Sequence, residues 1–281
     1  AKRQSKPMMT NAPRVAVVTG ANKGIGFYIA LQLGLSGLFS HIILGCRDAH
    51  RGAVAQQDIQ NQVSDKVTVQ NVPLTIGDNQ SHLDFCKKMN EEFGKVDVLV
   101  NNAGFAYKGS DPTPFKGQTK KTMAINYHGL VDFTETMFPL LRKGTDPRLV
   151  NVASMSGKLS QVSPELQAKL TDDNLTLEQL NGLMNQFETD VQSGIHSQQG
   201  WSNTNYGMSK LGVIAATKIW ARQEAPTISV NCCCPGYCAT DMASHRGPRP
   251  PSEGAKNAII PATMENPPIG EFFSDYKVAT W

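Results

Sequence analysis

The sequence predicts an α/β fold in which helices cover both faces of a doubly wound parallel sheet. Short runs of β-branched and other apolar residues recur along the 281 residues, and segments of helical period separate them. The first run ends in a cluster of glycines that leads straight into a helical segment. An apolar content of 40% suits one large core. One domain is therefore expected over residues 14–281, after a flexible N-terminal segment of residues 1–13.

Six buried strands are expected from the apolar runs, and their alternation with helical segments is typical of a parallel sheet. They lie at residues 15–18, 42–44, 67–72, 96–100, 149–152 and 228–231. A seventh strand is expected at residues 270–273. The segment before it, residues 247–268, is rich in proline and glycine, and we predict a loop there that is the most mobile part of the fold.

Three glycines separate the first predicted strand from the first predicted helix with the spacing G-x-x-x-G-x-G, and they are Gly20, Gly24 and Gly26. Glycines permit a tight turn and a close approach of the backbone to a ligand. The helix that follows offers free N–H groups and a partial positive charge to a pyrophosphate. This context favours a dinucleotide site over the alternative, a flexible turn without a ligand.

A tyrosine and a lysine stand four residues apart in Tyr206-Gly-Met-Ser-Lys210, so they share one face of the predicted helix. A positive charge beside a phenol stabilises the phenolate, which lowers the pKa of the tyrosine and makes it a better proton donor. Ser154 follows a predicted strand and could take part in the same site. The pair alone is weak evidence, because tyrosine and lysine often have this spacing by chance.

Further motifs follow in the order Asn101-Asn-Ala-Gly104, Asn126, Ser154, Tyr206 with Lys210, and Pro235-Gly236. Together with the glycine spacing, this order resembles the short-chain dehydrogenase/reductase family. Within the family, the chain is most similar to the monomeric NADPH-dependent carbonyl reductases, from about Val15 to Trp281. The segments that carry this closer likeness include Thr19-Gly-Ala-Asn-Lys-Gly-Ile-Gly26, Cys233-Cys-Pro-Gly236 and Thr240-Asp-Met242.

The resemblance implies a Rossmann fold and the NADPH-dependent reduction of small carbonyl compounds, such as quinones, aromatic ketones and aldehydes, to alcohols. It implies that Tyr206 donates a proton, that Ser154 polarises the carbonyl, and that Lys210 holds the nicotinamide ribose. Asn126 would anchor a water molecule that passes protons towards Lys210. The residues expected to bind the cofactor are Gly20, Asn22, Lys23, Gly24, Ile25, Gly26, Arg47, Thr75, Ile76, Asn102, Ala103, Gly104, Tyr206, Lys210, Pro235, Gly236 and Thr240.

Arg47 and Lys23 favour NADPH over NADH. Arg47 follows the second predicted strand, where a dinucleotide fold meets the adenosine ribose, and its planar donors suit a 2′-phosphate. Lys23 adds a second positive charge. Asp48 argues the other way, because an acid that binds both ribose hydroxyls would favour NADH. Thr75 stands where the family has an aspartate that holds the adenine, so weaker binding of the adenine is expected.

Apolar and aromatic residues around the predicted site suit flat or hydrophobic carbonyl compounds. The residues expected to bind the substrate are Ser154, Met155, Tyr107, Trp201 and Tyr237. Trp201 could equally be a core residue. Two other functions remain open on the same motifs: a dedicated biosynthetic or steroid/prostaglandin-type ketone reductase, and a non-catalytic NADP-binding sensor. The complete set of catalytic residues argues against the sensor.

An insert at residues 157–200 separates Ser154 from Tyr206 by many more residues than in ordinary members of the family. Ser163 followed by Pro164 predicts one helix start, and the capping box Thr176-Leu-Glu-Gln179 predicts another. The second helix would have one apolar face, made of Leu180, Leu183, Met184, Phe187 and Val191. In the carbonyl reductases that the chain resembles, such an insert covers the surface that other members use to pair, which implies a monomer. An insert without a role is the alternative.

Charge and composition argue against several other classes of protein. The net charge of +3 is small and spread along the chain, so no nucleic-acid partner is expected. No apolar run approaches the roughly 18 residues of a membrane span, and the first residues lack the apolar core of a secretory signal, so a cytoplasmic protein without a membrane partner is expected. The six cysteines suggest neither a disulfide framework nor a metal site. One of them, Cys234, is predicted to face the nicotinamide; the alternative is that the three consecutive cysteines are all buried and inert.

Overall fold

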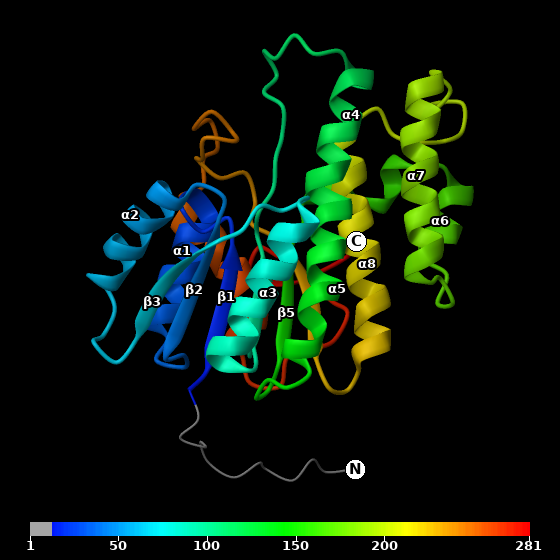
Figure 1. The fold of residues 1–281 in the computed structure, drawn as a ribbon. Coiled ribbons are helices and arrows are strands. Elements are labelled where there is room, and N and C mark those ends of the chain that lie inside the picture. Colours follow the sequence, from blue (N-terminus) through cyan, green and yellow to red (C-terminus); the bar gives the residue numbers. More distant parts are fainter. Residues whose placement is uncertain (1–12) are drawn as a thin grey trace.

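Eight strands form one sheet in the order β3-β2-β1-β4-β5-β6-β7-β8 in the computed structural model, which describes residues 13–281 (Figure 1). All neighbouring strands pair in parallel except the last two. The strands are β1 (Val15–Thr19), β2 (His41–Cys46), β3 (Thr68–Pro73), β4 (Val98–Asn101), β5 (Arg148–Val152), β6 (Ser229–Cys234), β7 (Phe272–Ser274) and β8 (Lys277–Ala279). The predicted fold class is therefore confirmed.

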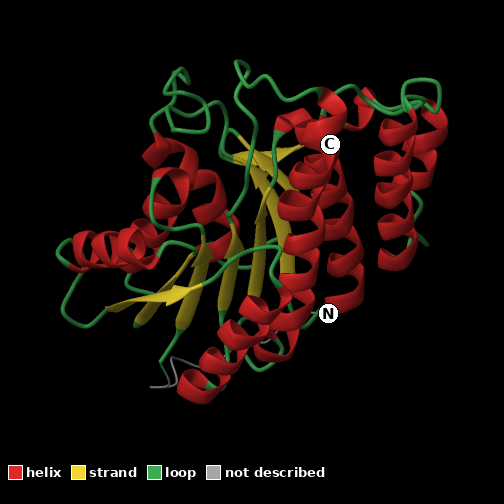
Figure 2. Cartoon of the chain, turned by 45° about the horizontal axis from the view of Figure 1, so that its top comes forward, coloured by secondary structure: helices red, strands yellow, loops and turns green. Residues whose placement is uncertain are grey.

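Helices cover both faces of this sheet (Figure 2). They are α1 (Gly24–Leu35), α2 (Ala49–Gln60), α3 (Asn79–Phe93), α4 (Phe115–Met123), α5 (Gly129–Leu141), α6 (Pro164–Leu170), α7 (Leu177–Ser193), α8 (Asn205–Glu224) and α9 (Pro251–Thr263). Successive side chains of β1 alternate between the faces, as the strand period of two requires. Val15 and Val17 join the core under α3, α5 and α8, whereas Ala16 and Val18 join the core under α1 and α9.

The prediction of a loop over residues 247–268 is wrong, because α9 lies within that segment. Pro251 stands in the first turn of the helix, where the missing N–H group costs no hydrogen bond. Ala255, Ala258 and Ala262 are buried in the core, and the helix packs against α1. The prolines were read as loop signals, but here they flank and end a helix that burial of its small residues stabilises.

The sequence analysis also missed β8, which forms a hairpin with β7. Asp275 and Tyr276 connect the two strands, and both have positive φ angles, 49° and 67°. Tight hairpins require such angles, and asparagine–glycine or aspartate–glycine pairs normally signal them. Tyrosine at the second position removed that signal from the sequence.

The insert forms two helices, α6 and α7, which lie on the outside of α4 and α8 (Figures 1 and 2). Ser163 caps α6, and both hydrogen bonds of the predicted capping box between Thr176 and Gln179 are present at the start of α7. Four of the five residues of the predicted apolar face are buried, and the fifth is partly buried; the buried four are Leu180, Met184, Phe187 and Val191. The helical insert is therefore confirmed.

The predicted flexible segment, residues 1–13, lies outside the described residues except for Pro13. The starting point of the domain at residue 14 stays a prediction. Between residues 13 and 281, none of the helices combines the length and apolar composition that a bilayer crossing requires.

Candidate active site

β1 and β4 are neighbours in the sheet, although the chain forms β2 and β3 between them. The strand order therefore turns back at this pair. In open α/β sheets, ligands bind at the carboxyl ends of strands where such a reversal occurs. The glycine loop follows β1, and Asn102, Ala103 and Gly104 follow β4, so both predicted cofactor segments start at this place.

The glycine loop makes a backbone cradle at the start of α1. Gly20 and Gly24 have φ angles of +66° and +58°, which other residues rarely adopt. A Cβ on Gly20 would lie 2.9 Å from the Cα of Ala103, so the loop also touches the segment after β4. Lys23 stands at the N-cap of α1, and its side chain makes no capping hydrogen bond. The first-turn N–H groups therefore have no side-chain cap and can bind an anion.

Four hydrogen bonds join the glycine loop to the segment after β4. The Oγ1 of Thr19 accepts from the backbone N–H groups of Asn102 and Ala103, at 3.0 and 2.9 Å. The Nδ2 of Asn102 donates to the carbonyls of Thr19 and Gly20, at 2.9 and 3.3 Å. Asn102 therefore holds the two halves of the cradle together, which is a structural role in addition to any contact with a cofactor.

The predicted catalytic residues converge beside Gly104. A Cβ on Gly104 would lie 3.6 Å from the Oδ1 of Asn126 and 3.8 Å from the Nζ of Lys210. Lys210 is buried one helical turn after Tyr206 on α8, and its Nζ donates to the Val152 carbonyl at 2.7 Å. Ser154 is the second residue after Val152, and its side chain makes a hydrogen bond with Tyr206. The structure thus brings all four residues together, although three different parts of the chain supply them.

Asn126 lies in a single π-helical turn, Ala124–His128, that joins α4 to α5. Its Oδ1 accepts from the backbone N–H of Phe105 at 2.7 Å, and its Nδ2 donates to the Phe105 carbonyl at 2.8 Å. The Nδ2 also contacts the Oγ of Ser209 at 3.2 Å. π-helical turns in longer helices are frequent at functional sites. The bonds to Phe105 fix the side chain, and the proposed anchoring of a water molecule stays a prediction.

Burial controls the acidity of the two central groups. Burial raises the pKa of Tyr206 to about 12, although the hydrogen bond with Ser154 acts in the opposite direction. Burial lowers the pKa of Lys210 to about 8. The net pKa of Tyr206 is thus raised and not lowered as predicted, because burial outweighs the effect of Lys210, whose ammonium lies 5.8 Å from the centre of the phenol ring and bonds the Val152 carbonyl. The phenol is therefore neutral at neutral pH and has a proton to donate.

Arg47 and Asp48 both follow β2, but their side chains have different roles. Asp48 is the N-cap of α2, and its carboxylate accepts from the backbone N–H of Arg51 at 3.0 Å. The same carboxylate lies 3.4 Å from the Nε of Arg51. Asp48 is therefore committed to its own helix, which explains how an acid next to Arg47 is compatible with binding of a phosphate. Arg47 is exposed.

Lys23 has a partner that the sequence analysis missed. Its Nζ lies 2.5 Å from the Oδ2 of Asp241, and about half of each side chain is exposed. Asp241 belongs to the loop after β6, and its neighbour Thr240 packs over Gly24. Asp241 lies in Thr240-Asp-Met242, one of the segments that resemble the carbonyl reductases. Nothing in the sequence, however, indicates that the loop with Asp241 reaches the start of α1. A phosphate at Lys23 would have to compete with this ion pair.

The predicted substrate residues divide into exposed and buried ones. Met155 and Tyr237 are 36% and 57% exposed, and Tyr107 packs edge-on against Phe105 with ring centres 4.9 Å apart. Trp201 is only 5% exposed. Its Nε1 donates to Asp190 at 2.8 Å, and its ring packs against Phe187 in α7. The prediction that Trp201 lines the substrate pocket is therefore wrong, because the insert needs this indole for its own core.

The three consecutive cysteines of β6 alternate between the two faces of the sheet. Cys232 and Cys234 join the core on the side of α8, whereas Cys233 joins the opposite core. A charge on Cys234 would raise the pKa of Tyr206, which places its sulfur near the phenol. Cys234 is nevertheless 4% exposed, and burial raises the pKa of Cys233 well above its usual range. Cys234 is thus on the predicted face but shielded from solvent.

Comparison with known proteins identifies the family. A model described as "short chain dehydrogenase" matches residues 14–164 and 190–250, which leaves out most of the insert. Carbonyl reductase (NADPH) 1 from Sus scrofa is 38% identical, with coverage of 97% of this chain and 96% of the relative. The Homo sapiens protein of the same name is 39% identical and is covered completely.

Solved structures agree with this result. Salutaridine reductase from Papaver somniferum is 30% identical, with a TM-score of 0.83 and coverage of 92% of this chain and 99% of that one. Menthone neomenthol reductase from Mentha piperita is 27% identical, with a TM-score of 0.75. The chain therefore belongs to the short-chain dehydrogenase family.

Proposed function

We propose that this protein is an NADPH-dependent carbonyl reductase, which reduces quinones, aromatic ketones and aldehydes to alcohols with Tyr206 as the proton donor. The observation that carries the proposal is the convergence of Tyr206, Ser154, Lys210 and Asn126 next to the glycine cradle. The similarity to the mammalian carbonyl reductases, over nearly the whole chain, supports the same reaction and the same coenzyme.

The described residues fit a dinucleotide with a 2′-phosphate. The positive φ angles of Gly20 and Gly24 shape the backbone of the cradle, and the start of α1 offers N–H groups to the pyrophosphate. Arg47 and Lys23 would hold the 2′-phosphate. Thr75 and Ile76, which follow β3, would contact the adenine. The remaining contacts would come from Asn22, Ile25, Gly26, Asn102, Ala103, Gly104, Pro235, Gly236 and Thr240, with Tyr206 and Lys210 at the nicotinamide end.

Bound NADPH supplies the hydride for the carbonyl carbon. Tyr206 donates its proton to the carbonyl oxygen, since burial keeps the phenol protonated at neutral pH. Ser154 donates a hydrogen bond to the same oxygen, which stabilises the negative charge that develops there. Lys210, with a pKa of about 8, is mostly charged at pH 7 and stabilises the phenolate that remains on Tyr206. Its own proton can then restore the phenol, with Asn126 as the next member of the relay.

A second function is favoured by the solved structures. Salutaridine reductase and menthone neomenthol reductase, which the chain resembles in fold, are each named for a particular compound. A dedicated biosynthetic ketone reductase would use the same catalytic residues. The exposed side chains of Met155, next to Ser154, and of Tyr237, next to Pro235-Gly236, would then help to decide which ketone is accepted.

NADPH consumption with a panel of quinones, aromatic ketones and aliphatic aldehydes tests the proposal. Turnover of at least two of these classes, with NADPH preferred over NADH, is the expected result. Turnover of a single ketone class would support the dedicated reductase instead. An enzyme that binds NADPH but reduces nothing in the panel, including at high substrate concentration, would contradict the proposal and favour a sensor.

Alkylation by iodoacetamide is expected to label Cys86 first, because it alone among the six cysteines is not buried. This labelling should leave turnover intact. Turnover should fall with the slower labelling of Cys234, and bound NADPH should change that second rate, because Cys234 lies near Tyr206 at the carboxyl end of β6. Peptide mapping of samples with known residual activity checks the assignment. Full labelling of Cys234 without loss of turnover would contradict it.

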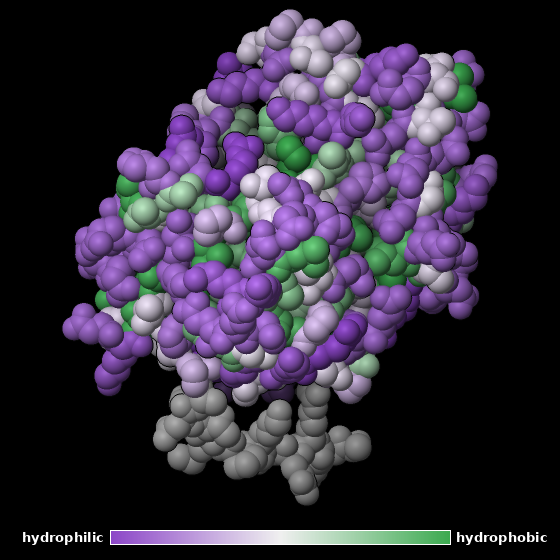
Figure 3. Space-filling model, in the orientation of Figure 1, coloured by the Kyte–Doolittle hydropathy of each residue, from purple (hydrophilic) through white to green (hydrophobic). Residues whose placement is uncertain are grey.

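The proposal extends to a monomer in the cytoplasm. The insert buries the apolar side of α7 against α4 and α8, and hydrophilic side chains cover most of the face shown in Figure 3. Six free thiols suit a reducing compartment. Sedimentation equilibrium should give a mass near 30.6 kDa, and twice that mass would contradict the monomer.

A further inference from the structure

The turn that carries Ser154 is a short structure with few bonds of its own. Ser154 starts a single 3-10 turn, η2 (Met155–Gly157). Its Oγ accepts from the backbone N–H of Ser156 at 3.1 Å, and its carbonyl accepts from the N–H of Gly157 at 2.9 Å. A three-residue helix has little stability by itself. The position of the Ser154 hydroxyl therefore depends on what holds the turn from outside.

One side of the turn lies directly on α8. A Cβ on Gly157 would lie 2.7 Å from the carbonyl carbon of Lys210 and 2.8 Å from the nitrogen of Leu211. Only a glycine permits this close approach. The turn with Ser154 therefore rests on the backbone of α8, the helix that carries Tyr206. Any shift of the turn changes the distance between the Ser154 hydroxyl and the Tyr206 hydroxyl.

Two side-chain donors hold the turn in this place. The Nε2 of Gln161 donates to the carbonyl of Ser156 at 2.9 Å and also lies 3.4 Å from the carbonyl of Gly207, next to Tyr206. The Nε1 of Trp281 donates to the carbonyl of Gly157 at 2.8 Å. No other side-chain bond to these two carbonyls is found within residues 13–281.

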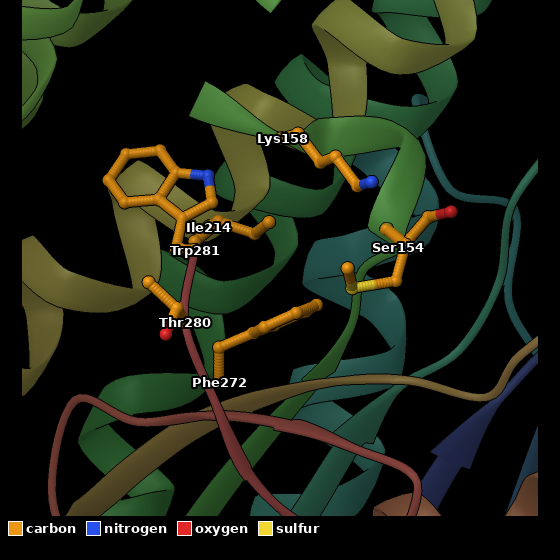
Figure 4. Close-up of a pocket in the computed structure, with 7 residues that line it drawn as sticks. Ser154, Lys158, Ile214, Phe272, Thr280 and Trp281 are labelled. Atoms are coloured by element: carbon orange, nitrogen blue, oxygen red, sulfur yellow. The ribbon is translucent and has the colours of Figure 1, made fainter. Parts of the chain in front are cut away.

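Trp281 reaches the turn because the hairpin of β7 and β8 carries it across the edge of the sheet. Its ring lies beside Ile214, Phe272 and Thr280, and together with Ser154, Met155 and Lys158 these residues enclose a small space (Figure 4). The Nζ of Lys218 lies 5.9 Å from the centre of the indole ring. Residues from β7, α8 and the end of the described chain thus meet behind the turn, on the side away from the Ser154 hydroxyl.

We propose that Trp281 is a positioning residue for catalysis, which holds the Gly157 carbonyl and thereby sets the place of the Ser154 hydroxyl relative to Tyr206. This inference rests on the proposed carbonyl reduction. Within the described residues, the side chain of Trp281 makes a hydrogen bond to Gly157 and none to Tyr206, Lys210 or the glycine loop. Its effect passes through one hydrogen bond and through the packing of Gly157 on α8.

Trp281→Phe removes the indole donor and keeps an aromatic ring. It is expected to lower kcat about three- to tenfold, the effect of one misplaced neutral hydrogen bond, while the KM for NADPH stays unchanged. In a Ser154→Ala background, the same substitution should lower kcat no further, because the group that it positions is absent. Equal losses in both backgrounds would overturn the proposal.

Trp220→Phe is the matched control. Trp220 is fully buried on α8, and its Nε1 donates to Glu135 at 2.6 Å, so this variant also loses one indole hydrogen bond. It should lower the Tm and leave kcat within about twofold of wild type, because Glu135 lies outside the site. A Trp220→Phe variant with the same kcat loss as Trp281→Phe would show a general effect of stability and would overturn the proposal.

Hydrogen exchange at the Gly157 amide gives a readout that needs no turnover. This amide bonds the Ser154 carbonyl, so its exchange rate reports the stability of the turn. Trp281→Phe should increase the rate at Gly157, and Trp220→Phe should not. If the wild type reduced no carbonyl compound, the proposed function would fail, yet the exchange result would still test the hold of Trp281 on the turn. An unchanged exchange rate at Gly157 in Trp281→Phe would contradict the claim that Trp281 stabilises the turn.

Discussion

Replacing Tyr206 with phenylalanine is expected to lower kcat for carbonyl reduction by about 10² to 10⁴-fold, the usual contribution of a general acid. The substitution removes the phenolic proton and little else, since Tyr206 and Phe have nearly the same shape. Affinity for NADPH should therefore remain close to that of the wild type. Single-turnover kinetics, with coenzyme binding followed separately by fluorescence, measures both quantities.

Tyr276→Phe serves as the control for this prediction. Its hydroxyl donates to Glu253 at 3.3 Å on the surface of α9, so the variant loses a phenol without touching the site. It should keep the kcat of the wild type. A Tyr206→Phe enzyme that retained more than about a tenth of the wild-type kcat, with chemistry as the slow step, would exclude Tyr206 as the proton donor.

Arg47→Ala is expected to weaken NADPH binding about ten- to more than a hundredfold and to leave NADH binding nearly unchanged. Only NADPH carries the 2′-phosphate that the guanidinium would contact. Lys23, the second charge at this end, already has a partner in Asp241, so Arg47 should provide most of the discrimination. Dissociation constants for both coenzymes, measured by calorimetry at one salt concentration, check the prediction.

Arg51→Ala is the matched control, because it removes the same charge only four residues away. Arg51 is exposed and contacts Asp48 at the start of α2. Its loss should change the affinity for both coenzymes by the same small factor. If Arg47→Ala also weakened both coenzymes equally, Arg47 would be structural, and the preference for NADPH would have to come from Lys23.

Much of the candidate site was visible in the sequence because its parts depend on local geometry. Gly20 and Gly24 adopt positive φ angles in a turn between a strand and a helix, and glycine is the residue that such a turn selects. Tyr206 and Lys210 share a helix face because helical spacing requires it. The capping box at Thr176 and Gln179 likewise involves only neighbours in the chain. The roles of these residues in binding and catalysis stay predictions until they are tested.

The incorrect predictions concern residues whose environment depends on segments that are distant in the chain. Trp201 and the prolines around α9 were assigned from residue type, but their places are decided by the segments that pack on them. The pKa of Tyr206 follows the same pattern. A lysine one turn away in sequence suggested a lowered value, whereas burial from all sides raises it to about 12. Residue type alone does not report how much of the surrounding volume other segments fill.

The sequence by itself determined the order of the strands and helices apart from α9 and β8, the glycine cradle, the two helices of the insert and the placing of Tyr206 and Lys210 on one helix face, since each depends on a periodicity or a motif within a short stretch of chain. Only the tertiary structure decided that Asp241 pairs with Lys23, that Asp48 caps its own helix, and that Trp281 reaches the Ser154 turn. The contacts of Asp241 and Trp281 join segments that are far apart in the chain, and separation along the chain does not predict distance in space. Packing of the sheet and its helices brings them together, and their energies depend on the burial that this packing creates.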